Sequence, residues 1–385
     1  MNVLFVTGAI PYAGATSGAA VVLAGELSAL ASRHRVTLVT FPPESRAEQA
    51  ALEAWRGSGV IVEAGHTAAP LPIVSAKRTA ERWWATRGNG PTRVEPVTGD
   101  ERTQAVIDRV LAKGDIDVVQ AESIGVGVYH YPDGVPRVVT EHEVARFDGV
   151  SNAWRDRQPK IWRGFDRVQV FTDADAGRIA SVAPDLADRV RVNPFGIDLP
   201  APLDPADVDA NAVTFIGGFR HAPNVDAALW LVNEILPLLH RRTPHAHIWL
   251  VGAHPPPEVR RLAGAHVTVT GQVPDVRPHL ARAAVVAAPV RLGGGMRRKV
   301  LDALAHGCAV VTTSRGADGL AGSSSTQPLR IADAADAFAE QIADLLGDQT
   351  RRRELGVGAR AFVAAHHSWS GFADRLDRVY REVCR

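Results

Sequence analysis

Short apolar runs, separated by segments with the apolar spacing of helices, constrain the fold of this chain more than any other feature. There are ten such runs, at residues 3–7, 36–41, 118–121, 138–140, 168–171, 213–216, 248–251, 267–270, 285–288 and 310–313. Strands that are apolar on both faces are typical of buried parallel sheets, and the segments between them supply crossover helices. We therefore predict an α/β protein with two doubly wound domains.

The stretch 198–212 separates the two halves because it is rich in Pro, Asp and Ala and has no clear periodicity. We predict an N-terminal Rossmann-like domain over residues 1–197, an interdomain linker over 198–212 and a C-terminal Rossmann-like domain over 213–367. Residues 368–385 carry apolar side chains at three- and four-residue spacing, which predicts a final helix.

The composition excludes several classes of function. The 385 residues carry a formal net charge of +1, so no global field favours nucleic acid or an anionic membrane. Cys308 and Cys384 are too few for a disulfide framework or a zinc cluster, and the histidines have no metal-ligand spacing, so we expect no metal site. The chain has no apolar run of about 18 residues, so we predict no membrane-spanning helix. The chain enters its first strand without a basic leader, so we expect a cytoplasmic protein.

The segment 289–307 contains the most informative motif. Gly293, Gly294 and Gly295 follow an apolar strand and precede a helix whose first turn is basic. Glycines leave backbone N–H groups unshielded and a helix N-terminus carries partial positive charge, so the loop suits a diphosphate. Lys299 and Asp302 share a helix face, where one can meet phosphate and the other sugar hydroxyls. A flexible loop followed by a solvated basic face is the alternative.

A second glycine pair ends the first strand of the second half. Gly217 and Gly218 allow a phosphate to approach the backbone, and Arg220 can supply a charge-assisted contact. Pro223 suits the first turn of the helix that follows.

The loop at residues 8–20 follows the first strand of the N-terminal half. Its glycine spacing does not match G-x-G-x-x-G, so we expect no nicotinamide or flavin cofactor. The loop still lies at the carboxyl end of a strand, where open α/β sheets bind ligands. Gly18 permits close approach by a ligand, and Ser17 suits the N-cap of the helix that follows. Helix capping alone explains Ser17 about as well as a role in a ligand site does.

His142 also follows an apolar strand, at the edge of the sheet that faces the predicted interdomain crevice. It could accept a proton from an acceptor hydroxyl or hold a substrate by a hydrogen bond. The alternative is a surface histidine among glutamates. Asp173 and Asp175 follow another strand, and we interpret Asp173 as the start of a helix rather than as a metal ligand.

Residues 75–96 contain Trp83 and Trp84 among basic residues. The segment could face an acceptor or make a peripheral membrane contact. We favour the alternative, a helix that packs through its tryptophans.

The order of these motifs resembles the GT-B retaining glycosyltransferases of family 4. The resemblance covers nearly the whole chain and is strongest over residues 213–320. It rests on Phe-Ile-Gly-Gly-Phe, Leu-Val-Gly, Gly-Gln-Val and Gly-Gly-Gly-Met-Arg-Arg-Lys-Val-Leu-Asp, which occur in the family's order. The fold it implies has two Rossmann-like domains that face each other across a cleft, with the last helix crossing back to the N-terminal domain.

The resemblance implies transfer of a hexose or modified sugar from a nucleoside diphosphate donor, with retained configuration and without metal or cofactor. Arg220 and Lys299 would hold the diphosphate and stabilise the leaving group. Asp302 would bind the ribose of the nucleotide. His142 would lie near the transferred sugar and the acceptor.

The glycines have implied roles as well. Amides from Gly293 to Met296, including Gly294 and Gly295, would approach the phosphates and sugar of the donor. Gly217 and Gly218 would line the donor site in the same domain. Gly18 would close over the diphosphate from the other domain.

The chain departs from the E-x7-E motif of that family, with Gly294 at the first acidic position and Asp302 at the second. The first acid often orients the transferred sugar, and aspartate reaches one methylene less far than glutamate. Two alternatives to a transferase therefore stay open: a nucleotide-sugar epimerase on the same fold, and a degenerate GT-B protein that binds without catalysis. The acceptor could be an envelope glycan, a lipid or a secondary metabolite.

Overall fold

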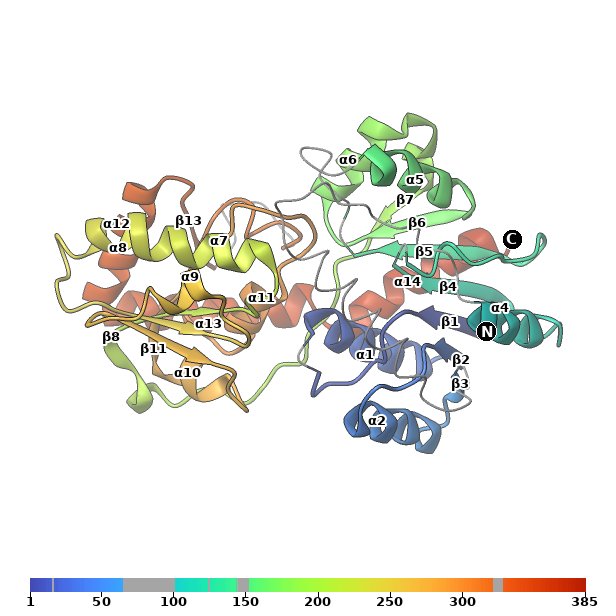
Figure 1. The fold of residues 1–385 in the computed structure, drawn as a ribbon, viewed down its shortest axis with the longest axis horizontal. Helices are drawn as coiled ribbons and strands as arrows, with labels where there is room; N and C mark the ends of the chain where they lie inside the picture. Colours follow the sequence, from blue (N-terminus) through green and yellow to red (C-terminus); the bar gives the residue numbers. More distant parts are fainter. Residues whose placement is uncertain (16, 65–100, 124, 143, 145–151, 321–327) are drawn as a thin grey trace. The chain divides into compact units, whose positions relative to one another are not determined.

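The computed structural model describes residues 1–385 except 16, 65–100, 124, 143, 145–151 and 321–327, and for 152–156 it describes the backbone alone. The chain forms two compact units (Figure 1). One unit contains Met1–Gly196 together with Trp369–Arg385, and the other contains Ile197–Ser368. The predicted segment 75–96 lies outside the described residues.

The first unit is built on a seven-stranded parallel sheet with the order β3-β2-β1-β4-β5-β6-β7. Its strands are β1 (Asn2–Thr7), β2 (Arg35–Thr40), β3 (Ile61–Ala64), β4 (Val118–Glu122), β5 (Arg137–Glu141), β6 (Arg167–Val170) and β7 (Val190–Val192). The strand order reverses between β1 and β4, and open α/β sheets bind ligands at the carboxyl ends of strands beside such a reversal.

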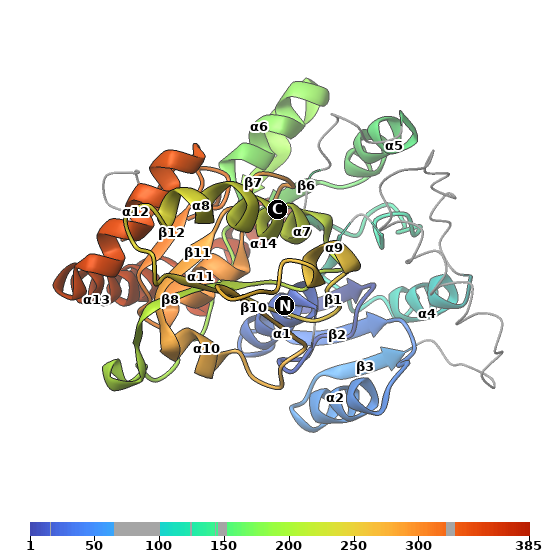
Figure 2. The ribbon, with the colours of Figure 1, turned by 60° about the vertical axis from the view of Figure 1, so that its left-hand side comes forward.

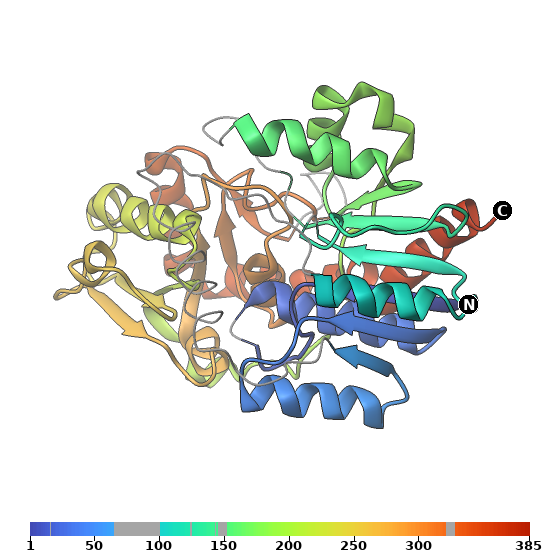
Figure 3. The ribbon, with the colours of Figure 1, turned by 45° about the vertical axis from the view of Figure 1, so that its right-hand side comes forward.

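The helices of this unit are α1 (Gly18–Ala31), α2 (Arg46–Gly57), α4 (Glu101–Leu111), α5 (Asn152–Arg163), α6 (Asp173–Val182) and α14 (Trp369–Val383). Helix α14 is the predicted final helix, and Figure 3 shows it in red against the N-terminal part of the chain. It packs on α1 at Gly25, where an added Cβ would lie 1.9 Å from the ring of Trp369. Arg33 also donates to Asp374 at 2.6 Å.

The second unit has a six-stranded parallel sheet with the order β10-β9-β8-β11-β12-β13. Its strands are β8 (Asp209–Ile216), β9 (His247–Val251), β10 (Val267–Gly271), β11 (Ala283–Ala288), β12 (Val310–Thr312) and β13 (Arg330–Ile331). Its helices are α7 (Ala222–Trp230), α8 (Leu236–Leu239), α9 (Pro257–Arg260), α10 (Arg277–Arg282), α11 (Arg298–Ala305), α12 (Ala335–Gly347) and α13 (Gln349–His366). Figure 2 shows α7 and α8 on one side of the sheet and α10 on the other.

All ten predicted strands are present, and the sequence analysis missed β3, β7 and β13. These three lie at sheet edges, where a short strand is only partly buried and lacks a continuous apolar run. Strand β8 begins at Asp209, inside the stretch predicted as linker, because Asp209 pairs with Ala283 and Ala212 with His247.

Several local predictions are also confirmed. Asp173 is the first residue of α6, and the hydroxyl of Thr172 caps that helix by accepting from the amide of Asp175 at 2.9 Å. Cys308 and Cys384 are both free thiols. None of the described helices is long and apolar enough to cross a bilayer.

Candidate functional site

Lys299 lies in the first turn of α11, and its side chain points back into the second unit. Its Nζ donates a hydrogen bond to Oδ1 of Asn224 on α7 and lies 4.7 Å from the centroid of the Phe215 ring. Asn224 is itself fixed, because its Nδ2 donates to the carbonyl of Gly218 at 2.7 Å. The ends of β8, α7 and α11 therefore meet at one ammonium group.

Closely packed glycines lie beside this contact between Lys299 and Asn224. A Cβ added to Gly217 would lie 2.8 Å from Asn224 and 3.0 Å from Nζ of Lys299. One added to Gly252 would lie 2.0 Å from the carbonyl oxygen of Gly217. A larger residue at Gly252 would therefore collide with the backbone, and one at Gly217 would displace the side chains of Asn224 and Lys299.

The environment of Lys299 disfavours its protonated form relative to water. Burial, with a smaller contribution from the charge of Arg297, lowers the pKa of Lys299 to about 7. Among the described residues, no carboxylate forms an ion pair with this ammonium group. A ligand with phosphate oxygens would supply the missing negative charge and favour the protonated form.

The glycine-rich loop precedes α11 and has an unusual backbone. Gly293 and Gly295 have φ angles of 83° and 75°, in the left-handed region that favours glycine. The carbonyl of Gly293 accepts a hydrogen bond from Nη1 of Arg315 at 3.0 Å. Gly294 and Met296 are buried. The loop is thus held in a defined conformation beside the first turn of α11.

Asp302 lies one turn after Lys299 on α11. Its carboxylate accepts from Nη2 of Arg298 at 3.1 Å, and burial raises its pKa while Arg298 and His306 oppose that rise. The carboxylate therefore has a partner on its own helix, which a ligand hydroxyl would have to share or replace.

Arg220 lies in the turn after β8 and is exposed. Within the described part of the chain it has no hydrogen bond or ion pair. Its neighbour Phe219 is buried in the core of the unit, which anchors the turn.

In the first unit, Gly18 is the first residue of α1, and nothing lies within 4 Å of an added Cβ there. Ser17 has the backbone conformation of an N-cap, but its side chain makes no capping hydrogen bond. The predicted N-cap position is therefore confirmed without the predicted side-chain bond.

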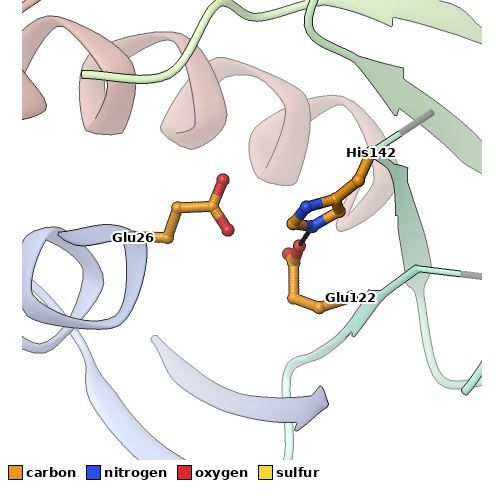
Figure 4. Close-up of side chains that lie close together, drawn as sticks. All are labelled: Glu26, Glu122 and His142. Carbon is orange, nitrogen blue, oxygen red and sulfur yellow. Dashed lines mark hydrogen bonds and ion pairs between the residues drawn. The ribbon is translucent and has the colours of Figure 1, made fainter. Parts of the chain in front are cut away.

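His142 directly follows β5 and is held by its neighbours (Figure 4). Its Nε2 lies 2.8 Å from Oε2 of Glu122, the last residue of β4, and its ring contacts Phe171 edge to face at 5.0 Å between centroids. The imidazole is therefore not a freely solvated surface group.

The structure thus groups Gly217, Gly218 and Lys299 in the second unit, with Asp302 and residues 293–296 along the same loop and helix. Gly18 and His142 belong to the first unit. Sequence reasoning missed Asn224 and Glu122. The strand-end position of Glu122 was a usable signal, whereas the contact of Asn224 with Lys299 joins residues 75 positions apart.

Solved structures resemble the chain over its full length. HepE of Anabaena, solved with UDP and glucose, is 14% identical with a TM-score of 0.70, over 99% of this chain and 100% of that one. Sucrose-phosphate synthase of Thermosynechococcus elongatus is 17% identical with a TM-score of 0.69, over 99% and 98%. TarM of S. aureus is 9% identical with a TM-score of 0.68, over 98% and 99%. The fold is GT-B.

The GT-B chain also has a sequence match in its second unit. Residues 210–348 match the family described as Glycosyl transferases group 1. That range contains Gly217, the glycine-rich loop, Lys299 and Asp302. No curated protein sequence matches the chain. The second unit is therefore similar to group 1 glycosyltransferases where it carries the Lys299 site.

Proposed function

We propose that this GT-B protein is a retaining glycosyltransferase that moves a hexose or modified sugar from a nucleoside diphosphate to a hydroxyl acceptor. The observation that carries the proposal is the half-buried Lys299, which follows a glycine-rich loop and whose ammonium has no carboxylate partner among the described residues. A buried cation without a counter-charge is costly unless a ligand supplies that charge. The match to group 1 glycosyltransferases over residues 210–348 supports the same function.

Lys299 would act on the leaving group. Transfer breaks the bond between the anomeric carbon and the diphosphate oxygen, so negative charge grows on that oxygen. An ammonium held in place by Asn224 stabilises this charge without reorganising. Arg220 would add a second, exposed cationic contact. Two cationic side chains give the diphosphate its counter-charge, so the proposed transfer needs no metal at the phosphates.

The remaining residues would bind the rest of the donor and the acceptor. Asp302 would accept from the ribose hydroxyls, and the loop from Gly293 to Met296 would approach the phosphates and sugar. Gly18 and His142 would contribute from the first unit, His142 by a hydrogen bond to the transferred sugar or acceptor. HepE has been solved with UDP-glucose, and TarM with UDP and alpha-GlcNAc-glycerol, which makes uridine donors the first to test.

A second candidate is a GT-B protein that binds a nucleotide-sugar without transferring it. Gly294 favours it, because this chain has no carboxylate where the related enzymes have the acid that often orients the sugar. Both candidates bind the nucleotide, so only turnover separates them.

Release of free nucleoside diphosphate from a panel of nucleotide-sugars, with an extract of envelope glycans, lipids and metabolites as acceptor, tests the proposal. We expect release that persists in EDTA and falls at least 100-fold in Lys299→Ala, since removing one transition-state donor costs about that factor. Lys113→Ala, which changes an exposed lysine of the first unit, is the matched control and should keep full activity. Full activity in Lys299→Ala would refute the assigned role. Binding without any release would favour the second candidate.

A further inference from the structure

Three side chains that are distant in sequence converge inside the first unit (Figure 4). Glu26 comes from α1, Glu122 from the end of β4 and His142 from the residue after β5. One oxygen or nitrogen atom of each lies within 4.8 Å of those of the other two. The two glutamates are 1% and 2% exposed. The fold therefore places two carboxylates and an imidazole around one buried point.

Glu26 is the member of this cluster whose burial is not explained by its hydrogen bonds. Neither of its carboxylate oxygens has a hydrogen-bond partner in the described part of the chain. Its side chain points toward Glu122 and His142. Burial and then the charge of Glu122 raise the pKa of Glu26 well above its ordinary value. A buried carboxyl group without a partner is costly unless a ligand or a proton compensates it.

Glu122, in contrast, is held in place by hydrogen bonds. Gln120 donates to Oε1 of Glu122 at 2.7 Å and accepts from the hydroxyl of Tyr380 at 3.0 Å. Oε2 of Glu122 faces His142 at 2.8 Å. Outer partners of this kind hold ligating carboxylates in metal sites. Among the described residues, no lysine or arginine forms an ion pair with Glu26 or Glu122, and the basic side chain of the cluster is His142.

We propose that Glu26, Glu122 and His142 bind one divalent transition-metal cation, of the class of Zn²⁺. One imidazole and two carboxylates form a donor set that Zn²⁺ accepts, at about 2.0 to 2.2 Å from each ligand atom. Ligand atoms around such a cation lie roughly 3 to 4 Å apart, which small side-chain adjustments of this cluster would satisfy. The cation would balance the charge of both carboxylates.

A proton shared by the two glutamates is the simplest competitor. Such a proton would join the two carboxyl groups by a hydrogen bond and would itself raise the pKa of Glu26, so the metal titration below has to separate the two. The cation would use one nitrogen of His142 and leave the other for a substrate hydroxyl. The site belongs to the first unit, whereas Lys299 belongs to the second, so the cation site does not depend on the proposed donor site.

The full chain, dialysed against EDTA and then against buffer, is titrated with Zn²⁺ and followed by metal analysis and thermal unfolding. We expect about one tightly bound equivalent and, at 100 times the dissociation constant, a rise in Tm of roughly 5 to 10 °C. Glu26→Gln should lose both, because it removes a charged ligand while keeping the shape of the side chain. Glu26→Met serves as a second variant if the first does not fold.

Asp175→Asn is the matched control, because Asp175 is a buried carboxylate of the same unit that pairs with Arg178 instead. It should retain the bound equivalent and the rise in Tm. The absence of a Zn²⁺-dependent rise in the wild-type chain would overturn the proposal and leave the shared proton. An equal rise in Glu26→Gln would overturn it too, because the metal would then bind elsewhere.

Discussion

At the scale of single residues, two ionisable side chains, Lys299 and Glu26, lack an ordinary ionic partner among the described residues. Lys299 has an amide oxygen and an aromatic ring for neighbours, and Glu26 has no hydrogen-bond partner among the described residues. Folding tolerates such groups only at a cost, and perturbed groups of this kind cluster at functional sites. The sequence identified Lys299 through its glycine-rich context. It gave no signal for Glu26, because only the packing of α1 on the sheet brings it to His142.

The lowered pKa of Lys299 predicts how diphosphate binding depends on pH. Binding favours the protonated amine, so affinity for UDP should be complete somewhat below pH 7 and should fall above it. The fall should approach tenfold per pH unit between about pH 7.5 and 9, because one proton is taken up with the ligand. Titration calorimetry at several pH values measures this slope. In Lys299→Arg, any binding that remains should lose the slope, since arginine stays protonated. A flat profile in the wild-type protein would show that protonation of Lys299 does not control binding.

At the scale of elements, the sequence predicted what is central and missed what is peripheral. The strands with a neighbour on both sides were all predicted, whereas β3, β7 and β13 pair on one side and have too few buried positions to produce a continuous apolar run. The edge strand β10 was predicted although it is only partly buried. The linker was predicted too long for a related reason: Asp209 and Asn211 are polar, yet they belong to β8. Polar residues at these positions indicate that this part of the strand is exposed, not that the strand has ended.

The contact between α1 and α14 gives a prediction at this scale. Gly25→Ala should destabilise the protein by about 1 to 3 kcal/mol, because the new methyl group would lie against the ring of Trp369. Gly177→Ala on α6, where nothing lies within 4 Å of the added Cβ, is the control and should be neutral or stabilising by up to about 1 kcal/mol. Urea unfolding monitored by tryptophan fluorescence measures both. Equal stability of the two variants would refute the packing argument.

At the scale of the whole molecule, the order of motifs along the chain was enough to predict two doubly wound units and the GT-B fold. HepE and sucrose-phosphate synthase have the same fold at 14% and 17% sequence identity. The grouping of Asn224 with Lys299, and of Glu26 with His142, could not be predicted. Those contacts depend on how the crossover helices pack on each sheet, and the spacing of apolar residues in the sequence does not specify that packing.

The second unit should bind a nucleoside diphosphate through Lys299, and thermal unfolding with UDP, GDP, dTDP and ADP in EDTA measures this binding. We predict that one diphosphate, at 100 times its dissociation constant, stabilises the wild-type chain by roughly 2.7 kcal/mol. Lys113→Ala should show the same shift, and Lys299→Ala should show none. A failure of all four to stabilise the wild-type chain, or an undiminished shift in Lys299→Ala, would contradict this prediction.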